Sequence, residues 1–218
     1  MGNSFVYNIP VKVYFGENQL GKLGKELSAF GKNVLIIYGG GSIKKNGLFD
    51  KAVAEIKKAE LEVFEFGGIE PNPKIDSIRR GAKFCKDNAI NVVLAIGGGS
   101  TIDASKWIAA GALSNEDPWK LVTGEVRTKE ALPIVTILTM AATGSEMDCF
   151  GVVTNPETNE KIGGGARVLL PKVSFLDPTN TYTVSKYQTA CGCADILSHI
   201  YEEYFNMNEG LYMLDSFM

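Results

Sequence analysis

The sequence contains a single histidine, His199, among its 218 residues. A site that needs two histidines from this chain is therefore excluded. The four cysteines form no Cys-x-x-Cys pair and no zinc-ribbon spacing. This pattern favours free, partly buried thiols in a reducing compartment over disulfides or a structural zinc site.

Long apolar runs and basic tracts are also absent. No run approaches the roughly 18 apolar residues that cross a bilayer, and no basic-then-apolar leader opens the sequence. The net charge is −3, with 45% hydrophobic and 22% charged residues, as in a globular protein. We therefore expect a cytoplasmic protein with neither a membrane nor a nucleic acid partner.

Three glycines and a serine follow an apolar run at two places in the sequence. Residues 91–96 precede Gly97-Gly98-Gly99-Ser100, and residues 34–38 precede Gly39-Gly40-Gly41-Ser42. Each pattern predicts a buried strand, a glycine turn and a helix N-terminus, where free N–H groups and the helix dipole favour an anion. Two such turns predict a ligand that carries phosphate at two separated places.

Neither glycine segment matches the dinucleotide fingerprint Gly-x-Gly-x-x-Gly. Ile102 and Lys44 occupy the place of the third glycine. For each segment taken alone, an ordinary strand-to-helix turn is the alternative. The repetition, and the two lysines that follow the first copy, favour phosphate binding.

Strand and helix patterns alternate over the first three quarters of the chain. Helical spacing predicts helices over 48–59 and 75–89, and residues 151–165 predict a β-hairpin. Short apolar or alternating runs predict strands over 11–15, 34–38, 61–66, 91–96, 133–139 and 173–176. This pattern predicts an α/β fold in which helices cover both faces of a parallel sheet, with ligands at the carboxyl ends of the strands.

Polar residues after the strand at 133–139 form a second candidate region. The turn that contains Thr143, Ser145 and Asp148 suits contacts with a ribose or a carboxamide, and a capped helix start is the alternative. Lys161, in the predicted hairpin, either reaches a phosphate or ribose or is simply solvated.

Asp195 and His199 are four residues apart in a segment that is helical from about residue 184, so they share one helix face. They could hold one metal ion together or form an ordinary surface pair. Catalytic divalent ions usually take three or four protein ligands, so other groups would have to complete the shell. We place a domain boundary near Tyr182, and the residues that follow are too few for a core of their own.

Six motifs occur in the order found in one enzyme family. They are Phe15-Gly-Glu-Asn18, Tyr38-Gly-Gly-Gly-Ser-Ile-Lys-Lys45, Gly97-Gly-Gly-Ser-Thr-Ile-Asp-Ala-Ser-Lys106, Ala142-Thr-Gly-Ser-Glu-Met147, Leu176-Asp-Pro178 and Ala194-Asp-Ile-Leu-Ser-His199. Together they resemble the iron-containing (group III) alcohol dehydrogenases, and within them the butanol dehydrogenase-like branch. The resemblance extends from about residue 7 to residue 205.

The resemblance implies a dehydroquinate synthase-like, parallel-sheet dinucleotide-binding domain over residues 1–181. The first helices of an all-helical metal-binding domain would follow over residues 182–218. By position, the pyrophosphate would be held by Gly97, Gly98, Gly99 and Ser100, with Asp103 nearby. Residues near the nicotinamide half would be Thr139, Thr143, Asp148, Lys161 and Thr183. Asp195 and His199 match the first two metal ligands, for Fe²⁺ or Zn²⁺.

The resemblance also bears on the choice of cofactor. NAD-preferring relatives carry an acidic residue at the place of Gly39, where it holds the adenosine 2′-hydroxyl. This chain instead matches the 2′-phosphate cradle of NADP-preferring relatives, at Gly40, Gly41, Ser42 and Lys45. We therefore expect NADP(H), with NAD as the alternative.

The activity that the resemblance implies is metal-dependent hydride transfer between a primary alcohol or its aldehyde and the nicotinamide cofactor, in a homodimer. The family's helical domain supplies two further histidine ligands from later helices, whereas this sequence departs from the family pattern after Phe205. We therefore expect a truncated member of the family. The alternatives are an inactive NADP-binding remnant and a related glycerol dehydrogenase-like enzyme, which fits the cradle poorly.

Overall fold

The computed structural model describes residue 6 and residues 8–205. The chain divides into two compact units, which meet between Thr181 and Tyr182. All the strands of the described chain lie in the first unit. The part of the second unit beyond residue 205, which belongs to the expected metal-binding domain, lies outside the described residues.

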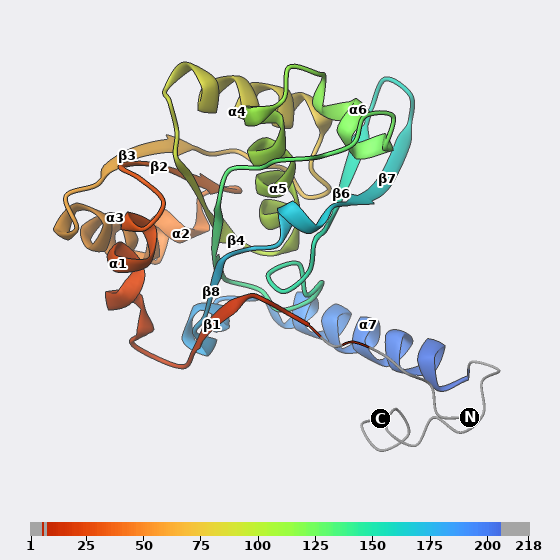
Figure 1. The fold of residues 1–218 in the computed structure, drawn as a ribbon. Helices are drawn as coiled ribbons and strands as arrows, with labels where there is room; N and C mark the ends of the chain where they lie inside the picture. The colour runs from red at the N-terminus through yellow and green to blue at the C-terminus, as the bar shows by residue number, and fades with distance from the viewer. Residues whose placement is uncertain (1–5, 7, 206–218) are drawn as a thin grey trace. The chain divides into compact units, whose positions relative to one another are not determined.

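A six-stranded parallel sheet forms the centre of the first unit (Figure 1). Its strand order is β1-β8-β5-β4-β2-β3, and each neighbouring pair is parallel. All six strands that the sequence predicts are confirmed, with bounds β1 (Lys12–Phe15), β2 (Asn33–Tyr38), β3 (Glu62–Phe66), β4 (Val92–Gly97), β5 (Ile134–Leu138) and β8 (Val173–Leu176).

Helices cover both faces of this sheet, as the strand–helix alternation predicts. One apolar cluster joins the sheet to α1 (Leu23–Ser28), α2 (Ser42–Lys45) and α3 (Leu48–Lys58). The other joins it to α4 (Ile75–Asp87), α5 (Gly99–Leu113) and α6 (Pro118–Thr123). Short 3-10 turns occur at η1 (Gln19–Lys22), η2 (Arg167–Leu169) and η3 (Pro178–Thr181). The expected α/β fold is therefore confirmed.

The predicted hairpin is also present, as the antiparallel pair β6 (Phe150–Asn155) and β7 (Glu160–Gly165). It packs against α5 rather than joining the main sheet. The indole Nε1 of Trp107 donates a hydrogen bond to the carbonyl oxygen of Gly151 over 3.0 Å. The hairpin therefore covers one side of α5, the helix that follows the second glycine segment.

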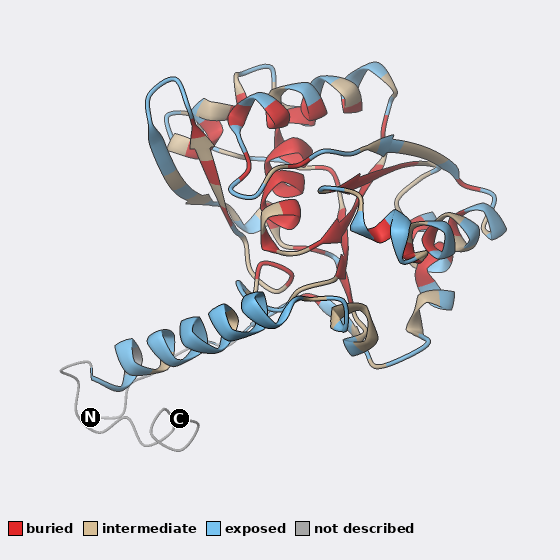
Figure 2. Cartoon of the chain, turned by 180° about the vertical axis from the view of Figure 1, so that it is seen from behind, coloured by how far each residue is buried: buried red, intermediate tan, exposed pale blue. Residues whose placement is uncertain are grey.

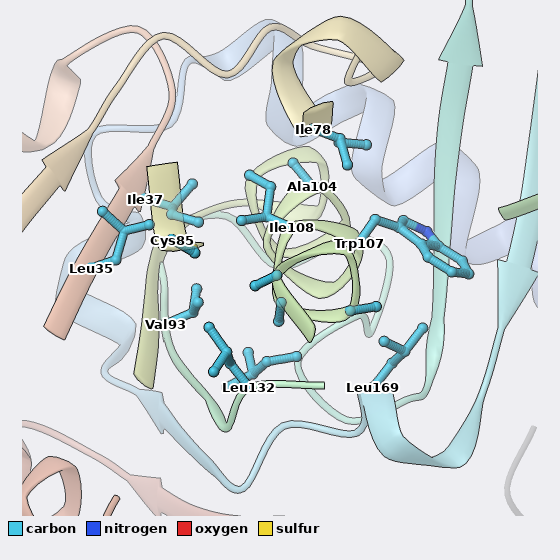
Figure 3. Packing of buried hydrophobic residues seen from close by; sticks show 14 of the residues in the cluster. Leu35, Ile37, Ile78, Cys85, Val93, Ala104, Trp107, Ile108, Leu132 and Leu169 are labelled. Carbon is cyan, nitrogen blue, oxygen red and sulfur yellow. The ribbon is translucent and has the colours of Figure 1, made fainter. Parts of the chain in front are cut away.

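Helix α5 is the most deeply buried helix of the described chain, and its centre is red in Figure 2. It is apolar on nearly all sides because the sheet, α4, α6 and the hairpin surround it. Figure 3 shows Ala104, Trp107 and Ile108 projecting from it toward different parts of the cluster. The approach of α4 is close, since a Cβ on Gly81 would lie 2.5 Å from Cδ1 of Ile108.

All four cysteines are free, as the sequence predicts. Burial raises the pKa of the Cys85 thiol to about 12, so this thiol stays protonated at neutral pH. The expected partial burial is wrong for Cys191 and Cys193, which are exposed on α7 (Lys186–Tyr204), the described helix of the second unit. Among the described residues, no helix combines the length and the apolar character needed to cross a bilayer.

Replacement of Ile108 by alanine should lower the free energy of unfolding by about 2–5 kcal/mol, because it leaves a cavity between α5, α4 and the sheet. Leu113→Ala is the matched control, since Leu113 is on the same helix but is 50% exposed. That change should cost less than about 1 kcal/mol. Urea denaturation followed by circular dichroism measures both, and equal losses would contradict this account of the core.

Candidate functional site

Both glycine segments lie at the carboxyl edge of the sheet, on neighbouring strands. Strands β2 and β4 pair in register up to Tyr38 and Ile96, and the glycines begin at the next residue of each strand. Loops at this edge of a parallel sheet are the usual ligand-binding region of α/β proteins. The sheet therefore brings together two segments that lie 58 residues apart in the sequence.

The N-terminus of α5 lies at this edge without a side-chain cap. The helix begins at Gly99, inside the glycine segment, and Gly98 is its N-cap residue. Within the described chain, the N–H groups of Gly98, Gly99 and Ser100 donate to no protein acceptor. Three unpaired donors at the positive end of a 15-residue helix favour an anion such as a pyrophosphate.

The glycine contacts show why side chains would not fit at this junction. A Cβ on Gly99 would lie 2.5 Å from Oγ1 of Thr143, and one on Gly97 would lie 2.5 Å from Oγ1 of Thr101. The loop after β5 therefore lies directly against the helix N-terminus. These two glycines are therefore required by the packing of the threonines, whereas a Cβ on Gly98 would first meet Cβ of Met140, at 3.4 Å.

The first glycine segment differs from the second more than the sequence indicates. It leads into α2, which has only four residues and ends at Lys45, before the turn at Asn46 and Gly47. Gly41 is in the left-handed region at φ +87°, which favours glycine. Because α2 is so short, its dipole is weak, and charge at this segment comes mainly from lysine side chains.

The two lysines of α2 have different surroundings. Lys44 forms an ion pair with Glu65 on β3, which also accepts a hydrogen bond from Tyr38. Lys45 is exposed and has no ion pair among the described residues. Lys45 is therefore the free cation of this segment, as the predicted phosphate cradle requires.

A buried polar network lies one helical turn below the α5 N-terminus. Asp103 accepts hydrogen bonds from Oγ of Ser145 over 2.6 Å and from the N–H of Val152 over 3.0 Å. Burial raises the pKa of the Asp103 carboxyl, and the Ser145 and Val152 hydrogen bonds oppose this shift. The carboxylate thus ties α5 to the 145–152 segment, rather than projecting to the free N–H groups.

Lys106 completes this network and was not predicted from the sequence. Its side chain is fully buried, and Nζ donates to Oγ of Ser145 over 2.9 Å, to Oδ1 of Asp148 over 2.7 Å and to the carbonyl of Phe150 over 2.6 Å. The sequence feature that could have indicated this role is a lysine within an apolar helix, three residues after Asp103. Its burial depends on the packing of the predicted hairpin against α5, and sequence spacing does not reveal that packing.

The residues expected near the nicotinamide half are not equally close to the glycine junction. The N–H of Thr139 donates to the carbonyl of Gly97 over 3.0 Å, and Thr143 packs on Gly99, so both lie at the junction. Asp148 is bound in the Lys106 network. Lys161 is exposed on β7 opposite Thr154, and Thr183 belongs to the second unit.

Thr154, which pairs with Lys161, shows where this part of the hairpin lies. The N–H of Thr154 donates to the carbonyl of Pro73 over 2.9 Å, beside the start of α4. The hairpin therefore reaches the loop that follows β3 at the carboxyl edge. That loop is itself tied to α5, because Oγ of Ser100 accepts a hydrogen bond from the N–H of Asn72 over 3.2 Å.

The segment around Thr143 is a series of turns, so the capped-helix alternative is wrong. Oγ1 of Thr143 accepts a hydrogen bond from the N–H of Ser145 over 3.2 Å, which closes a tight turn instead of opening a helix. Ser145 and Asp148 then turn toward Lys106. The hydrogen bonds from the Lys106 ammonium thus hold this segment in its turns.

The candidate metal ligands lie on α7 of the second unit. Nε2 of His199 is 3.7 Å from Oδ1 of Asp195, and the side chains are 74% and 58% exposed. Among the described residues, no group of three or more histidine, cysteine, aspartate or glutamate side chains could hold a metal ion. Two exposed donors fall short of the three or four that a catalytic ion usually takes, so the described residues alone do not fit one.

The structure defines an α/β protein with a parallel sheet, two glycine segments at its carboxyl edge and free N–H groups at the start of α5, the edge at which α/β proteins of this class bind their ligands. A family model described as iron-containing alcohol dehydrogenase matches residues 10–178. The chain belongs to the iron-containing alcohol dehydrogenase family.

The similar proteins include butanol dehydrogenases. The NADH-dependent butanol dehydrogenase A of Clostridium acetobutylicum is 50% identical over 212 residues, covering 97% of this chain and 54% of the relative. The NADPH-dependent aldehyde reductase YqhD of Escherichia coli is 37% identical over 205 residues, covering 93% and 52%. The chain therefore spans about half the length of the curated relatives that it matches.

The same similarity is seen in three dimensions. The crystal structure of NADH-dependent butanol dehydrogenase A from Thermotoga maritima superposes with a TM-score of 0.91 at 41% identity, covering 96% of this chain and 53% of that one. The resemblance inferred from the six motifs is therefore confirmed for both the family and the fold.

Asp148→Ala should lower the free energy of unfolding by about 2–3 kcal/mol, because it leaves the buried Lys106 ammonium without its ion-pair partner. Asp87→Ala is the control, since it breaks the exposed ion pair with Lys83. That control should change stability by about 0.5 kcal/mol or less. Urea denaturation at pH 7 measures both, and equal effects would show that burial of Lys106 does not matter.

Proposed function

We propose that the first unit binds a nicotinamide adenine dinucleotide, with the pyrophosphate at Gly97, Gly98, Gly99 and Ser100. The observation that carries this proposal is the N-terminus of α5, where three N–H groups point away from any protein acceptor of the described chain. The family membership supports the same ligand, since its named relatives depend on NADH or NADPH.

The other residues of the edge would orient the two ends of this cofactor. The adenosine would lie toward the segment from Gly40 to Lys45 on the neighbouring strand, and the nicotinamide toward Thr139 and Thr143 after β5. Asp103 and Asp148 would act by fixing the 145–152 segment. Lys161 would contact the ribose from the hairpin, and Thr183 would contribute from the second unit. A bound nicotinamide ring would accept a hydride from the substrate or donate one to it.

For the adenosine end we infer a preference for NADP(H). No carboxylate lies at positions 39–42, where it would repel a 2′-phosphate, and Lys45 is exposed and unpaired among the described residues. The cofactor in the relatives' names differs with their identity to this chain. The butanol dehydrogenases at 46–50% identity are named NADH-dependent, and YqhD at 37% is named NADPH-dependent. The charge of the loop, rather than overall similarity, is the basis of our inference.

We further propose that the chain serves a metal-dependent alcohol dehydrogenase or aldehyde reductase of the butanol dehydrogenase type, acting on primary alcohols and their aldehydes. Asp195 and His199 would be two ligands of Fe²⁺ or Zn²⁺. They supply only two of the required donors, so no step is assigned to the metal. A homodimer and a cytoplasmic location complete the proposal, and the four free cysteines are compatible with a reducing compartment.

Calorimetric titration of the 218-residue chain should detect binding of NADP⁺, and Gly98→Ala should weaken that binding by about tenfold or more, because a methyl group beside the free N–H groups blocks an anion. A Cβ at Gly98 lies 3.4 Å from Met140 Cβ, so the fold should tolerate it. Gly21→Ala is the control, since that Cβ meets nothing within 4 Å. Unchanged affinity in Gly98→Ala would refute the assigned pyrophosphate site.

The same chain should show little or no oxidation of 1-butanol with NADP⁺, even with added Fe²⁺ or Zn²⁺. The reason is that the described residues provide two metal donors. Because His199 is one of these two donors, His199→Ala should weaken further any Zn²⁺ binding that calorimetry detects. Robust metal-dependent turnover, lost in His199→Ala, would contradict this expectation and favour a complete metal site.

A further inference from the structure

The ion pair between Lys44 and Glu65 lies beside the proposed adenosine site and has no role in the function described so far. Lys44 belongs to α2, directly after the first glycine segment, and Glu65 lies near the carboxyl end of β3. Tyr38, the last residue of β2, donates its hydroxyl hydrogen bond to the same carboxylate. Three neighbouring elements at the sheet edge therefore meet at Glu65.

Aromatic rings also hold the Lys44 side chain in this position. Its Nζ lies 5.1 Å from the centre of the Tyr38 ring and 4.7 Å from the centre of the Phe49 ring. The hydrogen bond to Glu65 raises the pKa of Lys44, and the hydrogen bond from Lys44 lowers the pKa of Glu65, so both groups are charged at neutral pH. The Lys44 charge is thus neutralised by Glu65, while the next residue, Lys45, remains free.

We propose that Glu65 is a positioning residue for the discrimination between NADP(H) and NAD(H). It holds and neutralises Lys44, so that of the two lysines of α2 only Lys45 keeps an uncompensated charge for the adenosine 2′-phosphate. This inference rests on the proposed cofactor site. A carboxylate at the end of β3 thereby limits the attraction for a 2′-phosphate, although it lies outside the glycine segment.

The proposal gives opposite predictions for the two members of the pair. Glu65→Gln frees Lys44 and removes a negative charge, so the affinity ratio of NADP⁺ to NAD⁺ should rise about threefold to tenfold. Lys44→Gln leaves Glu65 unpaired, so the ratio should fall by a similar factor. Glu65→Asp keeps the charge and should restore a ratio close to that of the unmodified chain.

Calorimetry with NADP⁺ and NAD⁺ measures the ratio, and adenosine 2′,5′-bisphosphate against 5′-AMP tests the phosphate without the nicotinamide half. The changes in this affinity ratio in Glu65→Gln and Lys44→Gln should become smaller in 1 M salt, because exposed charges are screened there. A purely structural effect would persist. Glu62→Gln is the matched control, since it makes the same change at the exposed amino end of the same strand and should leave the ratio unchanged.

The possible results distinguish a failure of the Glu65 inference from a failure of the proposed cofactor site. If the unmodified chain binds both nucleotides but Glu65→Gln and Lys44→Gln leave the ratio unchanged or shift it in the same direction, this inference is overturned and the cofactor site stands. If the folded, unmodified chain binds neither nucleotide, the proposed function fails and the inference fails with it.

Discussion

The burial of helix α5 is the constraint on which the rest of the first unit depends. The helix is packed on all sides by the sheet, α4, α6 and the hairpin, so its direction and its starting point are fixed. At its N-terminus the N–H groups of Gly98, Gly99 and Ser100 have no acceptor among the described residues, and glycine at 97 and 99 lets Thr101 and Thr143 pack closely there. A rigid core thus holds a set of unpaired N–H donors at a defined place, which preorganises them for an anionic ligand.

In the polar network beneath that N-terminus, the Lys106 side chain is fully buried and Asp103 is buried, whereas the Asp148 side chain is 40% exposed. Lys106 and Asp103 project from α5 into the hairpin side and bind the segment between β5 and β6. Both charged groups are held by several hydrogen bonds, which offsets the cost of burying them. The residues with free N–H groups, 98–100, and the residues that hold the loop, Asp103 and Lys106, are therefore distinct, and they follow one another along the first turns of α5.

Much of the fold follows from patterns in the sequence, and the omissions have physical causes. The apolar runs predict the strands because parallel strands are buried on both faces. Helices α1 and α6 were not predicted, since each has six residues and too few turns for a clear apolar period, although Asp117 and Pro118 mark the start of α6. Both glycine segments are found from sequence, but Gly98–Ser100 opens a long helix and Gly40–Ser42 a single turn. The partners of Asp103, Lys106 and Glu65 are set by tertiary packing, which no local pattern reports.

The order of the strands has a consequence for how the polypeptide acquires its structure during synthesis. Strand β1 is made first, yet its only neighbour in the sheet is β8, whose residues are translated last among the six. The ribosome must therefore release almost the whole first unit before this edge can close. Such a long chain segment between two partner strands slows closure, so β1 stays unpaired until β8 has been made.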